Sequence, residues 1–401
     1  MLTDVAPTNA RAPLAEVTPD APEVLVATIL HATGTTGVHT HFTQLRQHLD
    51  SQGISSRVVT PFSWGMPFTA PVFAVRLGLQ HPSTAAGVVW YRYWHGAFLA
   101  KALKRELRSC GPVVIYAQEP VAAQAALRAR SGPHQKVVMA VHFPRSQADE
   151  WARKKLIVAN GRVYKAIQDM EREVICSLDG IIYVSHSARR ELLEWMPEAC
   201  AVPSVVVSNF ITAIAPPEPA TPLGDLVTVG GLEYVKNHEF LLRVLAETKR
   251  AGRPLTLDVY GNGPLAKELN QVAGSLGIKD LVRMRGFQAD VREHLPRYSI
   301  YVHASLEETG PLAIIEAMAA GLPVVASPRG SIGEVCRDGI EGRFWPLDDP
   351  AEAARILIEV ASSPEERARM GQAAQRRFRE EYDASVVAGN LTAFLLAQAR
   401  K

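Results

Sequence analysis

The chain has 401 residues, 47% of them hydrophobic and 21% charged, and a formal net charge of +2. This composition predicts a globular protein of two or three domains, and the near-neutral charge gives no basis for binding nucleic acid. No apolar run is long enough to span a membrane. The four cysteines lie far apart, without the spacing of a metal site or of a disulfide framework, so free thiols in a reducing cytoplasm are expected.

Residues 1–22 contain acids, prolines and alanines but no signal-peptide pattern, and we expect a flexible tail there. Beyond this tail, short β-branched runs alternate with helical patterns, which is typical of βαβ units and parallel sheets. The first half of the chain is expected to contain six strands: Val24–Leu30, Arg57–Thr60, Val113–Ala117, Val137–Val141, Ile181–Val184 and Val205–Val207.

A cluster of prolines between residues 216 and 222 indicates a linker, which we place at residues 213–224. Five more strands are expected after it: Leu226–Val229, Leu255–Tyr260, Val282–Arg285, Ile300–His303 and Val324–Ala326. The predicted fold class is therefore α/β, with two doubly wound Rossmann-like domains (residues 23–212 and 225–383) that face each other across a cleft. A last amphipathic helix, residues 384–401, is expected to pack back on the first domain.

The first half of the chain contains three candidate functional features, which either follow strands or carry charge. A loop rich in Gly and Thr leads at Gly37 into a helix, and it either lines an anion site or forms only a turn, since it lacks the lysine of a P-loop. His142 follows the strand Val137–Val141, where it acts as a proton carrier or hydrogen-bond partner, or is structural. A basic helix expected from Trp151 past Lys165 is either a solvated face or an element that contacts an acceptor or a membrane surface.

Two glycine-containing loops follow strands in the second half. Gly230 lies in the first loop, and Lys236 stands just before a helix expected over Glu239–Arg250. A lysine at the positive end of a helix is unfavourable unless an anion binds there, so this position indicates an anionic ligand. Gly261 and Gly263 lie in the second loop, where glycines permit either a tight turn or the close approach of a ligand.

Glu308 and Glu316 are the most informative pair in the chain. Gly310 and Pro311 are expected to open an apolar, buried helix in which Glu316 is the only charge, and Gly321 is expected to close it. Glu316 lies about 7.5 Å along that helix and leans back toward its start. Both carboxylates and the backbone N–H groups from Gly310 to Leu312 should therefore converge, which predicts a ligand rich in hydroxyls and phosphate.

Together these motifs resemble the retaining glycosyltransferases of family GT4, which have the GT-B fold. Glu308 and Glu316 have the family's spacing of two glutamates separated by seven residues, and the following run Ala317–Ala326 is similar to its consensus. Further similarity to family motifs is found at Val229–Leu232 with Lys236, Tyr260–Pro264, Arg285–Phe287, Gly37, His142, Ser185 and Asn209.

The resemblance implies the transfer of a sugar, with retention, from a nucleoside diphosphate sugar to a hydroxyl of a glycan, lipid-linked or small-molecule acceptor. UDP is the commonest nucleotide of the family. The first domain would carry the acceptor site and the second the donor site. Because the chain has no Asp-x-Asp pair, neither a metal nor another cofactor is expected. We expect a cytoplasmic enzyme, with the inner face of the membrane as a candidate site of peripheral contact.

The resemblance also assigns roles to residues. It implies that Lys236 and the backbone N–H groups from Gly310 to Leu312 stabilise the departing diphosphate, with Gly310, Pro311 and Leu312 lining the donor site. Glu316 would hold the ribose, and Glu308 and His142 would contact the donor sugar. The glycines expected to line the donor site are Gly37, Gly230, Gly261 and Gly263.

Several positions depart from the family pattern. Gly231 stands where many members have a phosphate-binding arginine, Thr36 and His39 replace a glycine and a glutamate, and Thr309 replaces a phenylalanine. Two alternatives to a transferase remain open at this point. One is a nucleotide-sugar epimerase of the same architecture, which needs no acceptor. The other, motivated by Gly231, is a non-catalytic protein that binds nucleotide sugars.

Overall fold

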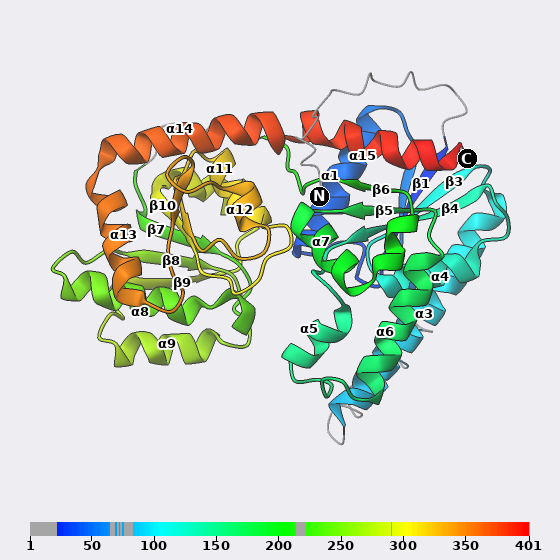
Figure 1. Ribbon diagram of the computed structural model, residues 1–401, viewed down its shortest axis with the longest axis horizontal. Coiled ribbons are helices and arrows are strands. Elements are labelled where there is room, and N and C mark those ends of the chain that lie inside the picture. Colours follow the sequence, from blue (N-terminus) through cyan, green and yellow to red (C-terminus); the bar gives the residue numbers. More distant parts are fainter. Residues whose placement is uncertain are drawn as a thin grey trace. The chain divides into compact units, whose positions relative to one another are not determined.

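The computed structural model describes residues 22–64, 69, 72, 74–75, 83–213, 221–289 and 291–400 (Figure 1). All but the last residue of the expected tail at 1–22, and most of the expected linker at 213–224, lie outside the described residues. The chain divides into two compact units. One contains the residues up to Val184, Arg189–Val207 and the chain from Ala384 onward, and the other contains Ser185–Ala188 and Ser208–Asp383.

The first unit is built on a parallel sheet of six strands in the order β2-β1-β3-β4-β5-β6. Its strands are β1 (Glu23–Ala27), β2 (Ser56–Val59), β3 (Val113–Ala117), β4 (Gln135–Val141), β5 (Gly180–Tyr183) and β6 (Ser204–Val206). The chain runs from β1 to β2 on one side and then crosses to β3 on the other. This reversal makes the carboxyl ends of β1 and β3 a topological switch point, where ligands bind in open α/β sheets.

Helices connect these strands, as the alternating pattern predicts. The α-helices are α1 (Gly37–Ser51), α3 (Thr84–Glu106), α4 (Pro120–Ala129), α5 (Gln147–Arg153), α6 (Arg162–Cys176), α7 (His186–Trp195) and α15 (Ala384–Ala399). Short 3₁₀ helices are η1 (Pro61–Trp64), η2 (Leu107–Ser109) and η3 (Pro197–Ala201). Helix α15 packs against α1, β3 and β4 within this unit and buries residues three to four apart, among them Val387, Leu391 and Leu395.

The prediction of a single helix from Trp151 past Lys165 is wrong. Helix α5 ends at Arg153 because Lys155 adopts a left-handed conformation with a φ of 57°. The Leu156 N–H then donates to the Trp151 carbonyl, which is the bonding of a Schellman cap, and α6 begins only at Arg162. Glycine normally occupies the left-handed position of this cap, so the lysine there gave no stop signal.

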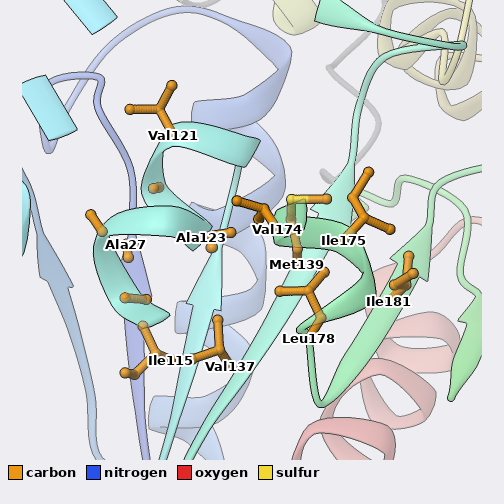
Figure 2. Packing of buried hydrophobic residues seen from close by; sticks show 14 of the residues in the cluster. Ala27, Ile115, Val121, Ala123, Val137, Met139, Val174, Ile175, Leu178 and Ile181 are labelled. Carbon is orange, nitrogen blue, oxygen red and sulfur yellow. The ribbon is translucent and has the colours of Figure 1, made fainter. Parts of the chain in front are cut away.

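The core of the first unit lies between the sheet and its helices. Figure 2 shows strand side chains of β1, β3, β4 and β5 packed against α4 and α6. Each of the labelled core residues is at most 8% exposed: Ala27, Ile115, Val121, Ala123, Val137, Met139, Val174, Ile175, Leu178 and Ile181. Burial on both faces explains why these strands read as continuous apolar runs in the sequence.

The second unit contains a second parallel six-stranded sheet, in the order β12-β11-β10-β7-β8-β9. Its strands are β7 (Gly224–Val229), β8 (Leu257–Tyr260), β9 (Val282–Gly286), β10 (Tyr298–His303), β11 (Val324–Ala326) and β12 (Gly342–Phe344), the last of which was not expected. Its helices are α8 (His238–Arg250), α9 (Ala266–Ser275), α10 (Val291–His294), α11 (Leu312–Ala319), α12 (Ile332–Val335), α13 (Pro350–Ser362) and α14 (Pro364–Glu381), with 3₁₀ helices η4 (Tyr234–Lys236) and η5 (Leu295–Arg297).

Helices cover both faces of this second sheet (Figure 1). Leu226 of β7 belongs to the core formed with α8, α9 and α13, whereas its neighbour Val227 belongs to the core formed with α11 and α14. Successive strand residues point to opposite faces, so one strand supplies both cores. The structure thus confirms the predicted α/β class with two Rossmann-like domains.

Candidate functional site

The topology of the second sheet places two loops from distant parts of the sequence side by side. From β7 the chain proceeds through β8 to β9 on one side, and then crosses to β10 on the other side of β7. The loops that leave the carboxyl ends of β7 and β10 therefore flank the topological switch point of this sheet. Lys236 follows β7 and Glu308 follows β10, so both lie where a ligand of this fold is expected.

Lys236 and Glu308 form an ion pair at this point. The Lys236 Nζ lies 2.5 Å from Oε1 of Glu308, and the Nε2 of His303 lies 2.9 Å from the same oxygen. The Glu308 side chain is only 8% exposed. Burial alone would raise the pKa of its carboxyl, but the charge of Lys236 and the hydrogen bond from His303 outweigh that effect and hold the pKa well below its ordinary range. Glu308 is therefore a buried acceptor that is ionised at neutral pH.

The loop that carries Glu308 is fixed on two sides. The Leu306 N–H donates to the Val235 carbonyl at 2.9 Å, and the Ser331 N–H donates to the Glu308 carbonyl at 2.9 Å. Gly330 packs so closely on this loop that a Cβ there would lie 2.0 Å from the Glu308 carbonyl oxygen. Only glycine fits, and the ion pair is thus held by backbone contacts as well as by its own charges.

Glu316 differs from Glu308 because nothing in the described chain neutralises it directly. It projects from α11, is half-buried, and accepts no hydrogen bond from any described residue. Burial raises the pKa of its carboxyl to about 7, with the positive charge of Arg292 acting in the opposite direction. Both Glu316 and Glu308 lie near the Tyr301 hydroxyl, where, after burial itself, their negative charges raise the pKa of the phenol. Both carboxylates therefore lie close enough to Tyr301 for their charges to act on the same hydroxyl.

The prediction that the backbone N–H groups from Gly310 to Leu312 form a row of free donors is wrong in part. Helix α11 begins at Leu312, with Pro311 as its N-cap rather than its first residue, and proline has no N–H to donate. The Leu312 N–H turns back to the Gly310 carbonyl at 2.9 Å, and the Asn209 side-chain amide donates to the same carbonyl at 3.0 Å. Of the three expected donors, only the Gly310 N–H has no partner among the described residues. Gly321 ends the helix as expected, with a φ of 74°.

The glycine loops after β7 and β8 pack on each other. Gly261 has a φ of 141°, and a Cβ on it would lie 1.9 Å from the Gly230 carbonyl oxygen; a Cβ on Gly263 would lie 2.5 Å from the Leu232 carbonyl oxygen. These two glycines are therefore needed for packing between the loops. Gly230 and Gly231 are different, because a Cβ on either would meet nothing nearer than 3.9 Å. Their openness leaves the backbone beside Lys236 accessible to a ligand.

This contrast makes a matched pair of substitutions informative. Gly261→Ala is expected to destabilise the protein by about 3 kcal/mol, because it forces a backbone clash at a positive φ. Gly230→Ala is expected to leave the midpoint of urea unfolding unchanged but to weaken binding of the anionic ligand that the sequence predicts by about 10-fold, if that ligand approaches the backbone here. Equal losses of stability in the two variants would show that Gly230 serves packing alone.

In the first unit, His142 lies at the carboxyl end of β4 as expected. Its Nε2 is 3.1 Å from Oε1 of Gln118, and the Gln118 amide is oriented by donating to the Tyr116 carbonyl at 3.4 Å. The imidazole meets His41 edge to face at 4.9 Å. Burial, with the neighbouring His41, holds the pKa of His142 well below its usual value. His142 is thus a neutral ring with its proton on Nε2 and Nδ1 left as an acceptor.

The loop that leads to Gly37 is held by two residues that depart from the family pattern. The His39 Nδ1 lies 2.7 Å from the Thr36 hydroxyl, and its Nε2 lies 3.0 Å from the His31 carbonyl. A Cβ on Gly34 would collide with the same imidazole at 2.4 Å. Gly37 itself is exposed at the first position of α1. Thr36 and His39 therefore contact each other and together hold the loop in place.

Two buried acidic or basic residues near these strand ends were not identified from the sequence. Glu119, after β3, accepts hydrogen bonds from the Ile29 N–H at 2.5 Å and from the Thr28 hydroxyl at 3.2 Å, and burial raises its pKa to about 7. His303 is the buried partner of Glu308. Each is a polar residue at the end of a strand, which is a weak signal in the sequence.

The described residues contain neither a candidate metal site nor a candidate membrane-spanning helix. No group of three or more His, Cys, Asp or Glu side chains in these residues is arranged to hold a metal ion. Within the same residues, no helix has both the length and the apolar character needed to cross a bilayer.

Two family profiles match the sequence. The profile described as Glycosyltransferase Family 4 matches residues 35–213, and that described as Glycosyl transferases group 1 matches residues 216–377. A D-inositol 3-phosphate glycosyltransferase of Streptomyces coelicolor is 36% identical over 37% of this chain and 35% of its own length. A glycogen synthase of Mycobacterium tuberculosis is 26% identical over 73% of this chain and 70% of its own. The chain thus spans little more than a third of the first of these relatives.

Solved structures share the fold over nearly the whole chain. The crystal structure of Anabaena HepE in complex with UDP and glucose has a TM-score of 0.68 at 17% identity, over 93% of this chain and 99% of that one. Sucrose-phosphate synthase from Thermosynechococcus elongatus has a TM-score of 0.71 at 15% identity, over 94% and 99%. The two profiles and the shared architecture confirm the resemblance seen in the sequence: the chain belongs to glycosyltransferase family 4 and has the GT-B fold.

Proposed function

We propose that this protein transfers a sugar from a nucleoside diphosphate sugar, with a UDP-sugar as the first candidate, to an acceptor hydroxyl, with retention at the anomeric carbon. The observation that carries the proposal is the buried ion pair of Lys236 and Glu308 at the switch point of the second sheet. The names of the relatives described above, a glycosyltransferase and two synthases, favour transfer over epimerisation.

Lys236 is the group that we assign to the departing diphosphate. Its ammonium has three N–H donors, of which one is directed at Glu308, and its side chain is 29% exposed. As the glycosidic bond breaks, negative charge grows on the phosphate oxygens and positive charge on the sugar ring. A fixed cation beside the phosphate stabilises that transition state more than the ground state, which is the condition for catalysis. The exposed backbone at Gly230 lets the phosphates approach.

The two carboxylates suit the hydroxyls of the donor. Glu308 is ionised and can only accept hydrogen bonds, so we assign it a hydroxyl of the donor sugar. Glu316 has no donor in the described chain, and the ribose hydroxyls of the nucleotide would supply one. His142, a neutral ring in the first unit with a free acceptor nitrogen, is assigned to a further hydroxyl of the donor sugar. The acceptor class stays open among glycans, lipid-linked sugars and small molecules.

The proposed reaction needs no metal, because Lys236 supplies the positive charge that a divalent ion provides at other diphosphate sites. Turnover is expected to persist within a factor of two in excess EDTA. A loss of activity that Mg²⁺ or Mn²⁺ restores would contradict this part of the proposal. We place the reaction in the cytoplasm, where nucleotide sugars are made available to this class of enzyme.

A donor screen followed by product analysis tests the proposal as a whole. A rise in melting temperature identifies the preferred nucleotide sugar, and NMR spectroscopy then follows the anomeric proton of that donor with and without candidate acceptors. A new glycoside with the anomeric configuration of the donor is the expected result. Conversion of the donor without any acceptor would identify an epimerase. Tight donor binding with no turnover across a broad acceptor panel would identify a non-catalytic binding protein.

A further inference from the structure

His303 is a buried residue of the candidate site to which the proposed chemistry assigns no step. It ends β10 and is 4% exposed. Its Nε2 lies 2.9 Å from Oε1 of Glu308, and its Nδ1 lies 3.3 Å from the Tyr301 hydroxyl. Both ring nitrogens are therefore engaged, one of them by a carboxylate that is ionised at neutral pH.

The charge of Glu308 decides which nitrogen of His303 carries the proton. An ionised carboxylate can only accept, so the His303 Nε2 must donate to it. In the neutral ring, the Nδ1 then accepts from the Tyr301 hydroxyl. The Tyr301 hydroxyl also lies 3.4 Å from the Val229 carbonyl. The direction of the bond from the His303 Nε2 to Glu308 is thus set by the charge of the carboxylate.

The two oxygens of the Glu308 carboxylate are used unequally. Both Lys236 and His303 donate to Oε1, from η4 and β10 respectively. Oε2 has no hydrogen-bond partner among the described residues. Two donors on one oxygen, from two different elements, fix the plane of the carboxylate as a single flexible lysine would not. The free oxygen is then the one left for a ligand.

We propose that His303 is a positioning residue that directs the free Oε2 of Glu308 at one hydroxyl of the donor sugar. This inference rests on the proposed function and deepens it, since it concerns how the sugar of the donor is recognised rather than its nucleotide. An acceptor oxygen with a fixed direction rejects a sugar whose hydroxyl lies elsewhere, because that oxygen would then lose its partner in a buried site. His303 therefore contributes to the choice between donors that differ in the configuration of one hydroxyl.

The comparison of two ligands separates this role from a structural one. Affinities for the nucleotide sugar and for its nucleoside diphosphate are measured by calorimetry in the wild type, His303→Leu and His303→Gln. His303→Leu is expected to lose about 10-fold in affinity for the nucleotide sugar and about 10-fold in kcat, with the affinity for the nucleoside diphosphate unchanged within a factor of two. Glutamine can place an N–H near the position of the imidazole Nε2, so His303→Gln is expected to recover most of both losses.

Each other outcome counts against the proposal. Equal losses for the two ligands in His303→Leu would show that the residue only supports the fold, and unchanged values would show that Glu308 needs no positioning. If His303→Leu does not fold, Tyr301→Phe serves instead, because it keeps the ring and removes only the hydroxyl that contacts the His303 Nδ1 and, at 3.4 Å, the Val229 carbonyl. It is expected to shift the ratio of the two affinities in the same direction by a smaller factor, and an unchanged ratio would overturn the proposal. Failure of the wild type to bind any nucleotide sugar would refute the proposed function itself.

Discussion

Replacing Lys236 by methionine is expected to lower kcat/KM by about 10²- to 10³-fold, the loss found when a single well-aimed group that stabilises transition-state charge is removed. Methionine keeps most of the length and apolar contacts of the lysine stem while deleting the ammonium. The effect should fall mainly on kcat, since the charge on the diphosphate grows as the bond to the sugar breaks. Steady-state kinetics with the donor varied at a saturating acceptor concentration measures it.

The same change leaves the Glu308 carboxylate buried without its cation, so it is also expected to destabilise the protein by about 2 kcal/mol, a figure reduced for the partial exposure of Lys236. The double variant Lys236→Met with Glu308→Gln removes both charges and should regain most of the stability in urea unfolding. It should not regain turnover. Recovery of turnover in the double variant, or near-wild-type kcat in the single one, would count against the phosphate role of Lys236.

The ion pair of Lys236 and Glu308 should also make the unfolding free energy of the protein depend on pH. The pKa of Glu308 is depressed in the folded protein, while an unfolded glutamate titrates near about 4.3. The contribution of the pair is therefore complete above that pH and is lost as the pH falls through the folded pKa. The difference in unfolding free energy between the wild type and the single Lys236→Met variant should accordingly be largest near neutrality and shrink in acid.

Replacing Glu316 by glutamine is expected to stabilise the protein and to weaken nucleotide binding at the same time. Burial raises the pKa of Glu316 to about 7, so between about pH 4.3 and 7 the folded protein binds more protons than the unfolded chain. Stability must fall as the pH rises through this window. Above it, Glu316→Gln should therefore gain about 2 kcal/mol in urea unfolding, and the gain should vanish near pH 4.

The loss of affinity has a separate cause. Glutamine offers one acceptor oxygen in place of an ionised carboxylate, so the hydrogen bonds to the ribose hydroxyls weaken by about 10- to 100-fold in Kd. Calorimetry with the nucleoside diphosphate measures this. Glu171→Gln is the control: Glu171 also has a pKa raised to about 7 by burial, but it accepts from the Ser146 hydroxyl and the Gln147 N–H. That variant should keep its nucleotide affinity. Unchanged binding in Glu316→Gln would remove the ribose role.

The strands of both sheets were predictable because a parallel strand buried on both faces reads as an unbroken apolar run. Val113–Ala117 and Val324–Ala326 have the expected bounds, and other strands shift by one to three residues. The strand β12 was missed because its three residues, Gly342 to Phe344, include an arginine and give no such run. An unbroken apolar run, rather than strand length, decided which strands the sequence revealed, since β11 has three residues like β12.

That Glu308 and Glu316 both act on the Tyr301 hydroxyl depends on local geometry, because Glu308 lies in the loop just before α11 and Glu316 lies on α11 itself. The pairing of Lys236 with Glu308 was not predictable, since 72 residues separate them and only the strand order of the folded sheet brings them together. Each residue was identified as a ligand contact from its own surroundings, and those roles remain predictions. The packing role of Gly261 could likewise not be distinguished from a ligand role before the neighbouring loop was placed.

The predicted start of α11 and the predicted continuation of α5 were wrong for the same reason. Proline is favoured at the first helical position, but Pro311 is the N-cap of α11, so its presence marked the helix start only to within one residue. Lys155 occupies a left-handed position that the sequence gave no reason to expect of a lysine. In both places the tertiary structure selected a backbone conformation that local preference left undecided.

A crystal structure of the protein with its preferred nucleoside diphosphate tests the central claim most directly. We expect a phosphate oxygen within hydrogen-bonding distance of the Lys236 ammonium and both ribose hydroxyls against the carboxylate of Glu316. A nucleotide bound away from the carboxyl ends of β7 and β10, or bound there with Glu316 turned away from the ribose, would contradict the account.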